Sequence, residues 1–398
     1  MEGIIDELYK LNCIKTGNFT LKNGRKSRYY YNLKSVVSVP RLVKIITRQL
    51  SYLIDETVGF GSFDRICGVP LGGLPFTFQL SFISGLPVII PRGKAKKYGM
   101  CANIEGEFQE GERCIVIEDV TTSCGSIRET YKILKSKGMN VLAFYTIIDR
   151  MESGIDNIDG IPIFSLINKT DLVRHNLNRI IKEKSTRLCF SADLTDGNKI
   201  IELLDKVGEN IAICKLHTDI IENFDEDVKT GLIDMANKHN FLLMEDRKFS
   251  DISIIVDKQW DRFRGWVDLV TVHGNVMPDV VSKLYGVLLV SDMSNNEYDH
   301  WVQSIDISKK YPNHILGYIT QKTHREINRI YRFCTKDYFF MTPGINFDKK
   351  TEGDQKFRNP ESLDTDICIV GRGIYNSEDI VDSSNKYKLA SIGNKNMI

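Results

Sequence analysis

The sequence lacks several features that identify common classes of protein. Its nine cysteines include no CxxC pair and have no regular spacing, which argues against a disulfide framework or a zinc site and suits a reducing cytosol. No apolar run approaches the roughly 18 residues that a membrane-spanning helix needs. Lys plus Arg (53) nearly balance Asp plus Glu (52), so charge gives no reason to expect nucleic acid or an anionic membrane as a partner. The opening MEGIIDELYK is typical of an amphipathic helix rather than a signal peptide, and we expect a cytoplasmic protein.

Two nucleotide-binding patterns are also missing, the GxGxxG of dinucleotide-binding folds and the GxxxxGK[ST] of P-loop proteins. The 398 residues exceed one typical domain, so we expect two or three. Hydrophobic residues make up 42% and charged residues 26% of the chain, which is ordinary for a globular protein.

The first part of the chain alternates short β-branched runs with helical patterns. The runs RICGVP, GLPVIIPR, GERCIVIEDV and MNVLAFYTIIDR predict a mostly parallel sheet covered by helices, in a domain over residues 1–160. The turn-rich TGNFTLKNGRKSRYYYN predicts a short hairpin near the start of this domain. Residues 161–187 have a weaker pattern that ends in a charged helix, so we expect a helical connector there.

A second series of strands and helices begins at residue 188. Eight short apolar runs, each followed by room for a helix, predict a (β/α)8 barrel over residues 188–398. In such barrels the reactive residues lie where strands end and loops begin. The polar or otherwise distinctive residues at the predicted strand ends are Asp193, Lys215, Asp246, Met293, Pro343 and Arg372.

The stretch MEDRKFSDI places Asp246, Lys248 and Asp251 directly after a predicted strand. A salt-bridged helix start would explain these charges without any function, because acids favour the first turn of a helix. Lys215 lies at the end of the preceding predicted strand and should face the same mouth of the barrel. Two lysines and two carboxylates sheltered from water could hold a charged intermediate and deliver a proton, which favours a functional interpretation.

Two further stretches have the character of phosphate sites. In IVGRGI, Gly371 and Gly373 permit close backbone approach and Arg372 could clamp a phosphate near the last barrel loops; a turn with an exposed arginine is the alternative. In CIVIEDVTTSCGSI, a buried strand ends in Glu118 and Asp119 before a turn and a helix. The turn could bind a 5-phosphate, and the two acids could bind ribose hydroxyls or magnesium. A capped helix after a strand, without any ligand, is the alternative for this stretch. The basic PRGKAKKYGM is either a solvated loop or a mobile lid that brings positive charge to a pyrophosphate.

These motifs together resemble the bifunctional uridine 5'-monophosphate synthase family, over nearly the whole chain. The motifs SAD, KLH, EDRKFSDI, DMS, TPGI and VGRGI match an orotidine 5'-phosphate decarboxylase half in order. The motifs FTLKNGRKS, AKKYG, IEDVTTS and IIDR match an orotate phosphoribosyltransferase half. The resemblance implies a type I phosphoribosyltransferase-like sheet followed by a TIM barrel. It also implies orotate, phosphoribosyl pyrophosphate (PRPP) and orotidine monophosphate as substrates, Mg2+ for the transferase step, no cofactor for decarboxylation, and a homodimer with shared active sites.

The resemblance assigns roles to individual residues of the barrel. Lys215, Asp246, Lys248 and Asp251 look like the family's charged network, with Lys248 as the proton donor to C6 and Asp251 contributed to the neighbouring subunit's site. Ribose, pyrimidine or phosphate contacts are implied for Asp193, Ser294, Pro343, Gln355, Gly371 and Arg372.

In the transferase half, the implied PRPP loop comprises Glu118, Asp119, Thr122, Ser123, Gly125 and Ser126. Positions near orotate or the pyrophosphate substrate are Lys22, Tyr29, Tyr30 and Arg150. The mobile loop, which crosses a dimer interface in the family, would contribute Arg92, Lys96 and Tyr98, with Lys96 in a catalytic role.

Some positions depart from the family pattern. Cys124 stands where the phosphate loop usually has Gly, Gly93 aligns with a lysine of the mobile loop, and Phe357 replaces a phosphate-binding Tyr. A decarboxylase whose transferase half serves only as a dimerisation scaffold is therefore one alternative. A magnesium-dependent keto-sugar phosphate decarboxylase, which shares the Asp-x-Lys-x-x-Asp triplet, and a non-catalytic nucleotide-binding protein are two others.

Overall fold

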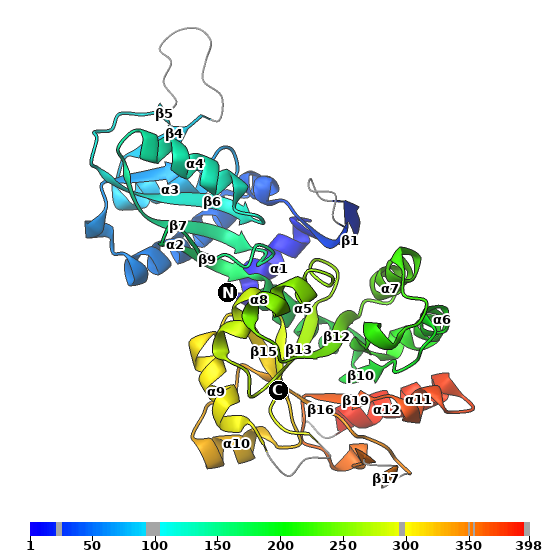
Figure 1. The fold of residues 1–398 in the computed structure, drawn as a ribbon. Helices are drawn as coiled ribbons and strands as arrows, with labels where there is room; N and C mark the ends of the chain where they lie inside the picture. The colour runs from blue at the N-terminus through cyan, green and yellow to red at the C-terminus, as the bar shows by residue number, and fades with distance from the viewer. Residues whose placement is uncertain (21–25, 93–103, 294–298, 349–350, 353–354, 394–398) are drawn as a thin grey trace. The chain divides into compact units, whose positions relative to one another are not determined.

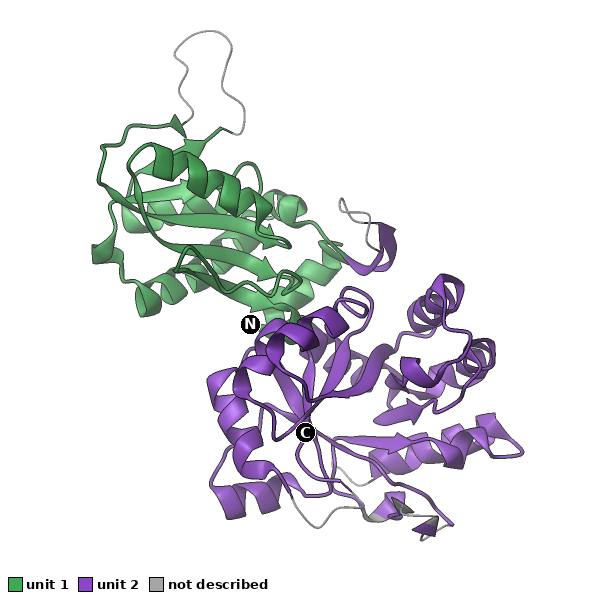
Figure 2. Ribbon diagram, in the orientation of Figure 1, with its two compact units in different colours: residues 1–15, 30–172 green, residues 16–29, 173–398 purple. Residues whose placement is uncertain are grey.

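Two separate sheets form from the two series of apolar runs (Figure 1). The computed structural model describes residues 1–20, 26–92, 104–293, 299–348, 351–352 and 355–393. The chain divides into an N-terminal unit, residues 1–15 and 30–172, and a barrel unit, residues 16–29 and 173–398 (Figure 2). Among the described residues, no helix is both long enough and apolar enough to cross a membrane.

The N-terminal unit is built on a seven-stranded sheet in the order β5-β4-β3-β6-β7-β9-β8. Its strands are β3 (Arg65–Gly68), β4 (Val88–Pro91), β5 (Ile104–Glu105), β6 (Arg113–Thr121), β7 (Asn140–Asp149), β8 (Asn157–Ile158) and β9 (Ile161–Asn168). The five inner strands are parallel and the two edge strands, β5 and β8, are antiparallel. The helices of this unit are α1 (Glu2–Lys10), α2 (Pro40–Thr57), α3 (Leu74–Ser84) and α4 (Gly125–Ser136). The mostly parallel, helix-covered sheet predicted from the sequence is confirmed.

The helix α4 covers one face of this sheet. Its Ile127 and Leu134 pack in one cluster with Val116 of β6 and Phe144 of β7, all completely buried. Because β6 and β7 are long, apolar and central, they fix the direction in which β6 delivers its final residues into the loop before α4.

Residues 161–168 differ from the helical connector that we predicted. They form β9, which pairs in parallel with β7. Most of its side chains are only half-buried, so the apolar signal that identifies central strands is weak here. The helical part of the connector is α5 (Lys169–Lys184), and the boundary between the two units falls within it.

The barrel unit closes eight parallel strands, as predicted. They are β10 (Leu188–Ser191), β11 (Ile213–Leu216), β12 (Leu242–Phe249), β13 (Leu269–His273), β14 (Val287–Val290), β15 (Ile315–Ile319), β16 (Phe339–Thr342) and β19 (Ile367–Val370). The helices around them are α6 (Gly197–Val207), α7 (Glu226–Lys238), α8 (Ser253–Trp260), α9 (Trp301–Lys310), α10 (His324–Tyr331), α11 (Arg372–Tyr375) and α12 (Ile380–Gly393). A short pair, β17 (Thr351–Glu352) and β18 (Gln355–Lys356), lies between β16 and β19 in the sequence.

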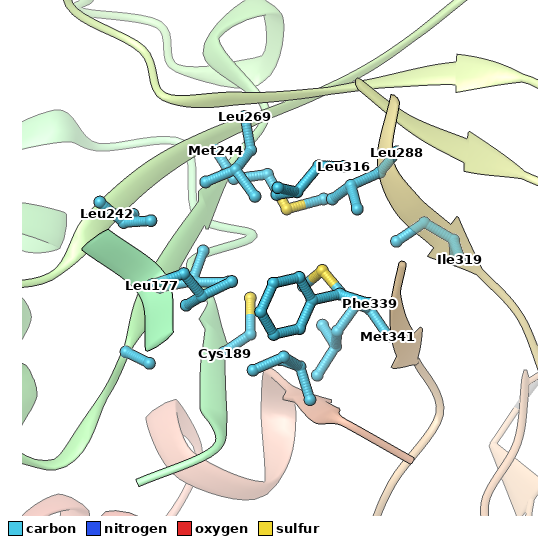
Figure 3. Packing of buried hydrophobic residues seen from close by; sticks show 14 of the residues in the cluster. Leu177, Cys189, Leu242, Met244, Leu269, Leu288, Leu316, Ile319, Phe339 and Met341 are labelled. Atoms are coloured by element: carbon cyan, nitrogen blue, oxygen red, sulfur yellow. The ribbon is translucent and has the colours of Figure 1, made fainter. Parts of the chain in front are cut away.

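Side chains fill the interior of the barrel, so it is a packed core. Each strand contributes at least one buried residue to this cluster, including Cys189, Met244 and Phe339. The cluster also contains Leu177 of α5, which points toward these side chains (Figure 3). Because the strands are closed and filled, their carboxyl ends form a rigid rim.

The predicted hairpin is present as β1 (Ile14–Thr20) and β2 (Lys26–Tyr31), and most of it belongs to the barrel unit (Figure 2). Arg28 is 2% exposed and its Nη1 donates to Asp268 at 2.5 Å. The same guanidinium donates to Asn237 Oδ1 at 3.1 Å and to the carbonyl of Phe241 at 2.7 Å. A buried guanidinium with carboxylate, amide and carbonyl partners fixes this arm, residues 16–29, to the barrel.

We predict that Arg28→Met destabilises the barrel unit by about 3–5 kcal/mol, because it leaves the Asp268 carboxylate buried without its cation. Urea unfolding followed by a probe in the barrel measures this loss. Arg113→Met is the matched control, since it breaks an ion pair with Asp64 whose side chains are 45% and 40% exposed. We expect the control to shift the midpoint little. Equal shifts for both variants would show that the arm is not an anchor.

Candidate active sites

Seven residues predicted for the decarboxylase site line one cavity at the carboxyl ends of the barrel strands. The cavity has a volume of about 230 Å3. These residues are Asp193, Lys215, Asp246, Lys248, Pro343, Gly371 and Arg372. They lie within or just after five different strands, β10, β11, β12, β16 and β19, so closure of the barrel is what brings them together.

The carboxylate of Asp246 lies at the centre of the charged residues. Its Oδ2 is 2.9 Å from Lys215 Nζ and 2.8 Å from Lys248 Nζ. The other oxygen, Oδ1, accepts a hydrogen bond from Thr271 Oγ1 at 2.8 Å. Lys215 Nζ also donates to Asp193 Oδ1 at 3.1 Å. The result is an alternating chain of carboxylates and ammonium groups on the wall of the cavity.

The charges in this chain hold one another ionised. Burial alone would raise the pKa of Asp246, but Lys215 foremost, with His217 and Lys248, holds it well below its usual range. Burial likewise opposes the Lys215 ammonium, yet Asp246 and Asp193 outweigh it and raise the pKa of that lysine. The pKa of Asp193 is also lowered against the effect of burial, chiefly by Lys215. The site therefore keeps fixed charges in a sheltered place near neutral pH.

A local distortion of β12 aims Lys248 into the cavity. The register with β13 shifts between Glu245 and Phe249, and Lys248 has a φ of 51°, in the left-handed region that few non-glycine residues adopt. The backbone N–H of Lys248 donates to Thr271 Oγ1 at 2.9 Å, so the same threonine holds both Lys248 and Asp246. Strained backbone of this kind is characteristic of functional sites.

Arg372 lies at another part of the same cavity, following β19. Its guanidinium carbon is 5.5 Å from the ring centre of Phe357, which also lines the cavity. A Cβ at Gly371 would lie 3.1 Å from the carbonyl oxygen of Ser191, so glycine lets the chain pass close to β10. Phe357 thus faces the arginine with a π surface and offers no hydroxyl there.

Three other residues predicted for this site are not tested by the cavity of this chain. Asp251 is exposed and does not line the cavity of its own chain. Ser294 lies outside the described residues, and the side chain of Gln355 is likewise not described.

Two residues at this site were missed by the prediction. His217 Nε2 is 2.9 Å from Lys215 Nζ and 3.2 Å from Asp246 Oδ2. The signal was available, because His217 is two residues beyond Lys215 and side chains two apart share a face of a strand. Asp292 also lines the cavity, 6% exposed, and accepts hydrogen bonds from Trp301 Nε1 and Thr320 Oγ1.

The second candidate site lies at the end of β6 in the N-terminal unit. Glu118 is 4% exposed and accepts hydrogen bonds from Ser126 Oγ at 2.5 Å and from the backbone N–H of Asp119 at 3.0 Å. Burial, aided by the neighbouring Asp119 carboxylate, raises the pKa of Glu118 to about 8. Gly72 is needed beside these acids, since a Cβ there would lie 2.1 Å from the Asp119 carboxylate.

The loop between β6 and α4 turns through Cys124. This residue has a φ of 58°, in the left-handed region that glycine favours. The loop therefore adopts this conformation even though a cysteine stands in place of glycine. The Cys124 side chain is 2% exposed, with Sγ 3.7 Å from Ser153 Oγ, whereas Ser123, Gly125 and Ser126 are exposed. The exposed part of the loop is thus open to a ligand.

The remaining transferase predictions have mixed outcomes. Arg150 is 5% exposed, with its guanidinium 5.0 Å from the ring centre of Tyr31. Tyr30 is 43% exposed, and Arg92 forms an ion pair with Glu105 at 2.5 Å. Lys22, Lys96 and Tyr98 lie outside the described residues.

Tyr29 lies in the part of the arm that belongs to the barrel unit. It is 4% exposed and its hydroxyl donates to Asp268 at 2.6 Å. Its place near orotate or the pyrophosphate substrate stays a prediction. Tyr31 of the same strand packs with Arg150 in the N-terminal unit.

The barrel half of the chain matches a known protein family. The model of the orotidine 5'-phosphate decarboxylase / HUMPS family matches residues 186–387, half of the chain. The chain belongs to this family. An orotidine 5'-phosphate decarboxylase of Pichia kudriavzevii is 32% identical over 246 residues, covering 56% of this chain and 92% of that protein.

The similarity extends beyond the barrel. An orotate phosphoribosyltransferase of Pyrococcus abyssi is 36% identical over 174 residues, covering 42% of this chain and 94% of that protein. The uridine 5'-monophosphate synthase of Bos taurus is 26% identical over 472 aligned positions, covering 98% of this chain and 96% of that protein. The chain is therefore homologous along its length to a fusion of the two enzymes, as the motifs predicted.

We predict that Glu118→Gln gains stability relative to the parent protein as pH rises from 5 to 8.5. A carboxyl whose folded pKa is raised to about 8 contributes stability that is present at low pH and lost as pH rises toward that value. Glutamine has no such loss. Thermal unfolding midpoints across this pH range measure the difference, with the exposed Glu56→Gln as control. A difference in unfolding midpoint between Glu118→Gln and the parent that stays constant across this pH range would contradict the raised pKa of Glu118.

Proposed function

We propose that the chain makes uridine monophosphate from orotate in two steps: orotate and PRPP give orotidine monophosphate and pyrophosphate, and decarboxylation then gives uridine monophosphate. Homology along the whole chain supports both steps. The observation that carries the proposal is the convergence of Lys215, Asp246 and Lys248 with Arg372 on one cavity.

For decarboxylation, Arg372 binds the phosphate and the pyrimidine ring lies toward Lys248. The bond between C6 and the carboxylate carbon breaks, carbon dioxide leaves, and its bonding electrons remain on C6. Lys248 transfers a proton to C6, which completes uridine monophosphate and leaves the lysine neutral until solvent restores its proton. In this scheme the residues of the chain supply all the acid chemistry.

The charged chain explains why the carbanion is accessible. An ammonium fixed beside C6 stabilises negative charge that is larger in the transition state than in the substrate, and such differential stabilisation raises the rate. Asp246 holds Lys215 and Lys248 in place, so little reorganisation accompanies the reaction. Asp193 and Lys215, at the end of this row of charged side chains, are placed to bind ribose hydroxyls.

For the transferase step, Glu118, Asp119 and the loop from Thr122 to Ser126 bind the ribose and 5-phosphate of PRPP. The described residues contain no group of three or more metal-ligating side chains, so a full protein cage for a metal is not formed there. Mg2+ commonly binds through one or two carboxylates together with substrate phosphates, and the two acids fit that mode. Bound at Glu118 and Asp119, it would neutralise charge on the pyrophosphate leaving group.

We also propose a homodimer in which Asp251 completes the partner's decarboxylase site. Asp251 is exposed, and the neighbouring Ile252 and Ile254 are 65% and 63% exposed. Met277 is 72% exposed as well. Large apolar side chains next to an exposed charge are typical of a surface that a partner covers. The eight described cysteines are free, which fits the cytoplasmic location that we propose.

One observation favours the alternative in which only the decarboxylase is active. Cys124 holds a left-handed backbone at a cost of the order of 1 kcal/mol relative to glycine, in the loop that would bind phosphate. Separate assays of the two steps distinguish the two proposals: PRPP-dependent consumption of orotate is expected if both activities are present.

Two variants are expected to separate the activities. Lys248→Ala should lower decarboxylation by a factor of the order of 10³ or more, because the proton donor is lost, while orotate consumption continues. Gly72→Ala should lower orotate consumption and leave decarboxylation unchanged, since the added Cβ displaces Asp119. Gly61→Ala, where a Cβ meets nothing within 4 Å, controls for loss of glycine. Normal decarboxylation by Lys248→Ala would refute the mechanism.

A mixed dimer tests whether the site is shared. We predict that co-expressed Lys248→Ala and Asp251→Ala chains recover about a quarter of the parent decarboxylase activity, because half of the randomly formed dimers contain one intact site. Each variant alone stays inactive. Differently tagged chains allow the mixed dimer to be purified and assayed. No recovery in a purified mixed dimer would place all the catalytic groups in one chain.

A further inference from the structure

Glu245 is a buried acid directly next to the central carboxylate of the barrel site, and the mechanism above does not use it. Its side chain is completely buried. Met244 and Asp246 line the cavity, whereas Glu245 does not. Successive side chains of a strand point to opposite faces, so Glu245 points from β12 away from the cavity.

The carboxyl of Glu245 contacts the turn that follows the neighbouring strand β11. Both of its oxygens lie 3.3 Å from the backbone nitrogen of Thr218, which donates to them. Thr218 begins a 3-10 turn, Thr218–Ile220, and is itself buried. A second contact between this turn and β12 joins Asp219 to Arg247 at 2.6 Å, but its side chains are 50% and 35% exposed. Glu245 is therefore the buried attachment of the turn to β12.

The residue immediately before this turn is His217, whose Nε2 is 2.9 Å from Lys215 Nζ and 3.2 Å from Asp246 Oδ2. The imidazole thus lies against both charges of the central pair, Lys215 and Asp246. Moving the backbone of Thr218 would move His217 with it, since the two are covalently adjacent.

The charge of Glu245 also matters at this position. Burial raises the pKa of Glu245 to about 8; the contacts with Thr218 oppose this rise, and the carboxylates of Asp219 and Asp246 add to it. Lys215 on β11 is the nearby cation of the site, and it is already paired with Asp193 and Asp246. Below pH 8 a neutral Glu245 can hold the turn without a second negative charge behind Asp246.

We propose that Glu245 is a positioning residue for decarboxylation, which holds the turn at Thr218 and thereby fixes His217 against Lys215 and Asp246. The inference depends on the proposed decarboxylation, and extends it to a residue that touches no substrate. Ionised Glu245 would place a negative charge near C6 of the pyrimidine, which becomes negative during the reaction. Decarboxylation therefore slows when Glu245 loses its proton.

The test compares Glu245→Gln with Glu245→Leu in the full-length protein. Glutamine keeps a carbonyl acceptor for Thr218 and should retain kcat within about twofold at pH 6.5, whereas leucine, of similar size without an acceptor, should lower kcat at least tenfold with KM nearly unchanged. Glu226→Leu, at an exposed position of α7, is the control for removing a carboxylate. If both Glu245 variants keep the parent kcat, the proposal is wrong.

A pH profile separates positioning from a purely structural role. The parent kcat should fall between pH 7 and 9 by a step that is absent in Glu245→Gln, and identical profiles would overturn the proposal. If Glu245→Leu fails to fold, judged by its melting midpoint and its binding of uridine monophosphate, the glutamine profile decides alone. A parent protein without decarboxylase activity would instead refute the proposed function, independently of Glu245.

Discussion

The barrel site depends on one carboxylate shared by two ammonium groups. The Asp246 side chain is 11% exposed, and its carboxylate stays ionised against the effect of burial because Lys215 and Lys248 lie within 3 Å of it and His217 lies close by. Lys215 depends on Asp246 in the same way, since burial opposes its charge and Asp246, with Asp193, restores it. The arrangement requires a scaffold that positions residues of β11 and β12 together.

The closed barrel supplies that scaffold, with one local exception. Parallel strands bring their carboxyl ends to a common rim, so residues from distant parts of the chain meet there without special loops. Regular β geometry is not sufficient for Lys248, whose left-handed backbone follows a shift in register between β12 and β13. Thr271 of β13 stabilises the exception by bonding both the Lys248 backbone and the Asp246 side chain. Regular structure sets the position of the rim, and one strained residue sets the direction of the Lys248 side chain.

The sequence allowed the barrel and its charged residues to be predicted because buried parallel strands are almost uninterrupted apolar runs, so a charge at their end is conspicuous. The same logic missed β9, whose half-buried side chains give a weak signal. It could not reveal the contact of Tyr29 with Asp268, because the two residues lie 239 positions apart and no local pattern links them. Contacts between residues so far apart in the sequence form only when the chain folds, so a short family motif does not predict them.

The strand β12 is held at both ends by residues in or next to its neighbour β13, and one of these residues also anchors the arm. Asp268, just before β13, binds Arg28 and Tyr29 of the arm and also accepts the backbone N–H of Leu243 at the start of β12. Three residues beyond Asp268, Thr271 of β13 holds the other end of β12 through the Lys248 backbone and the Asp246 side chain. The carboxylate that anchors the arm is thus one of the groups that fix the strand carrying Asp246 and Lys248. Residues near the start of the chain are, by this connection, part of the support of a site whose charges come from its second half.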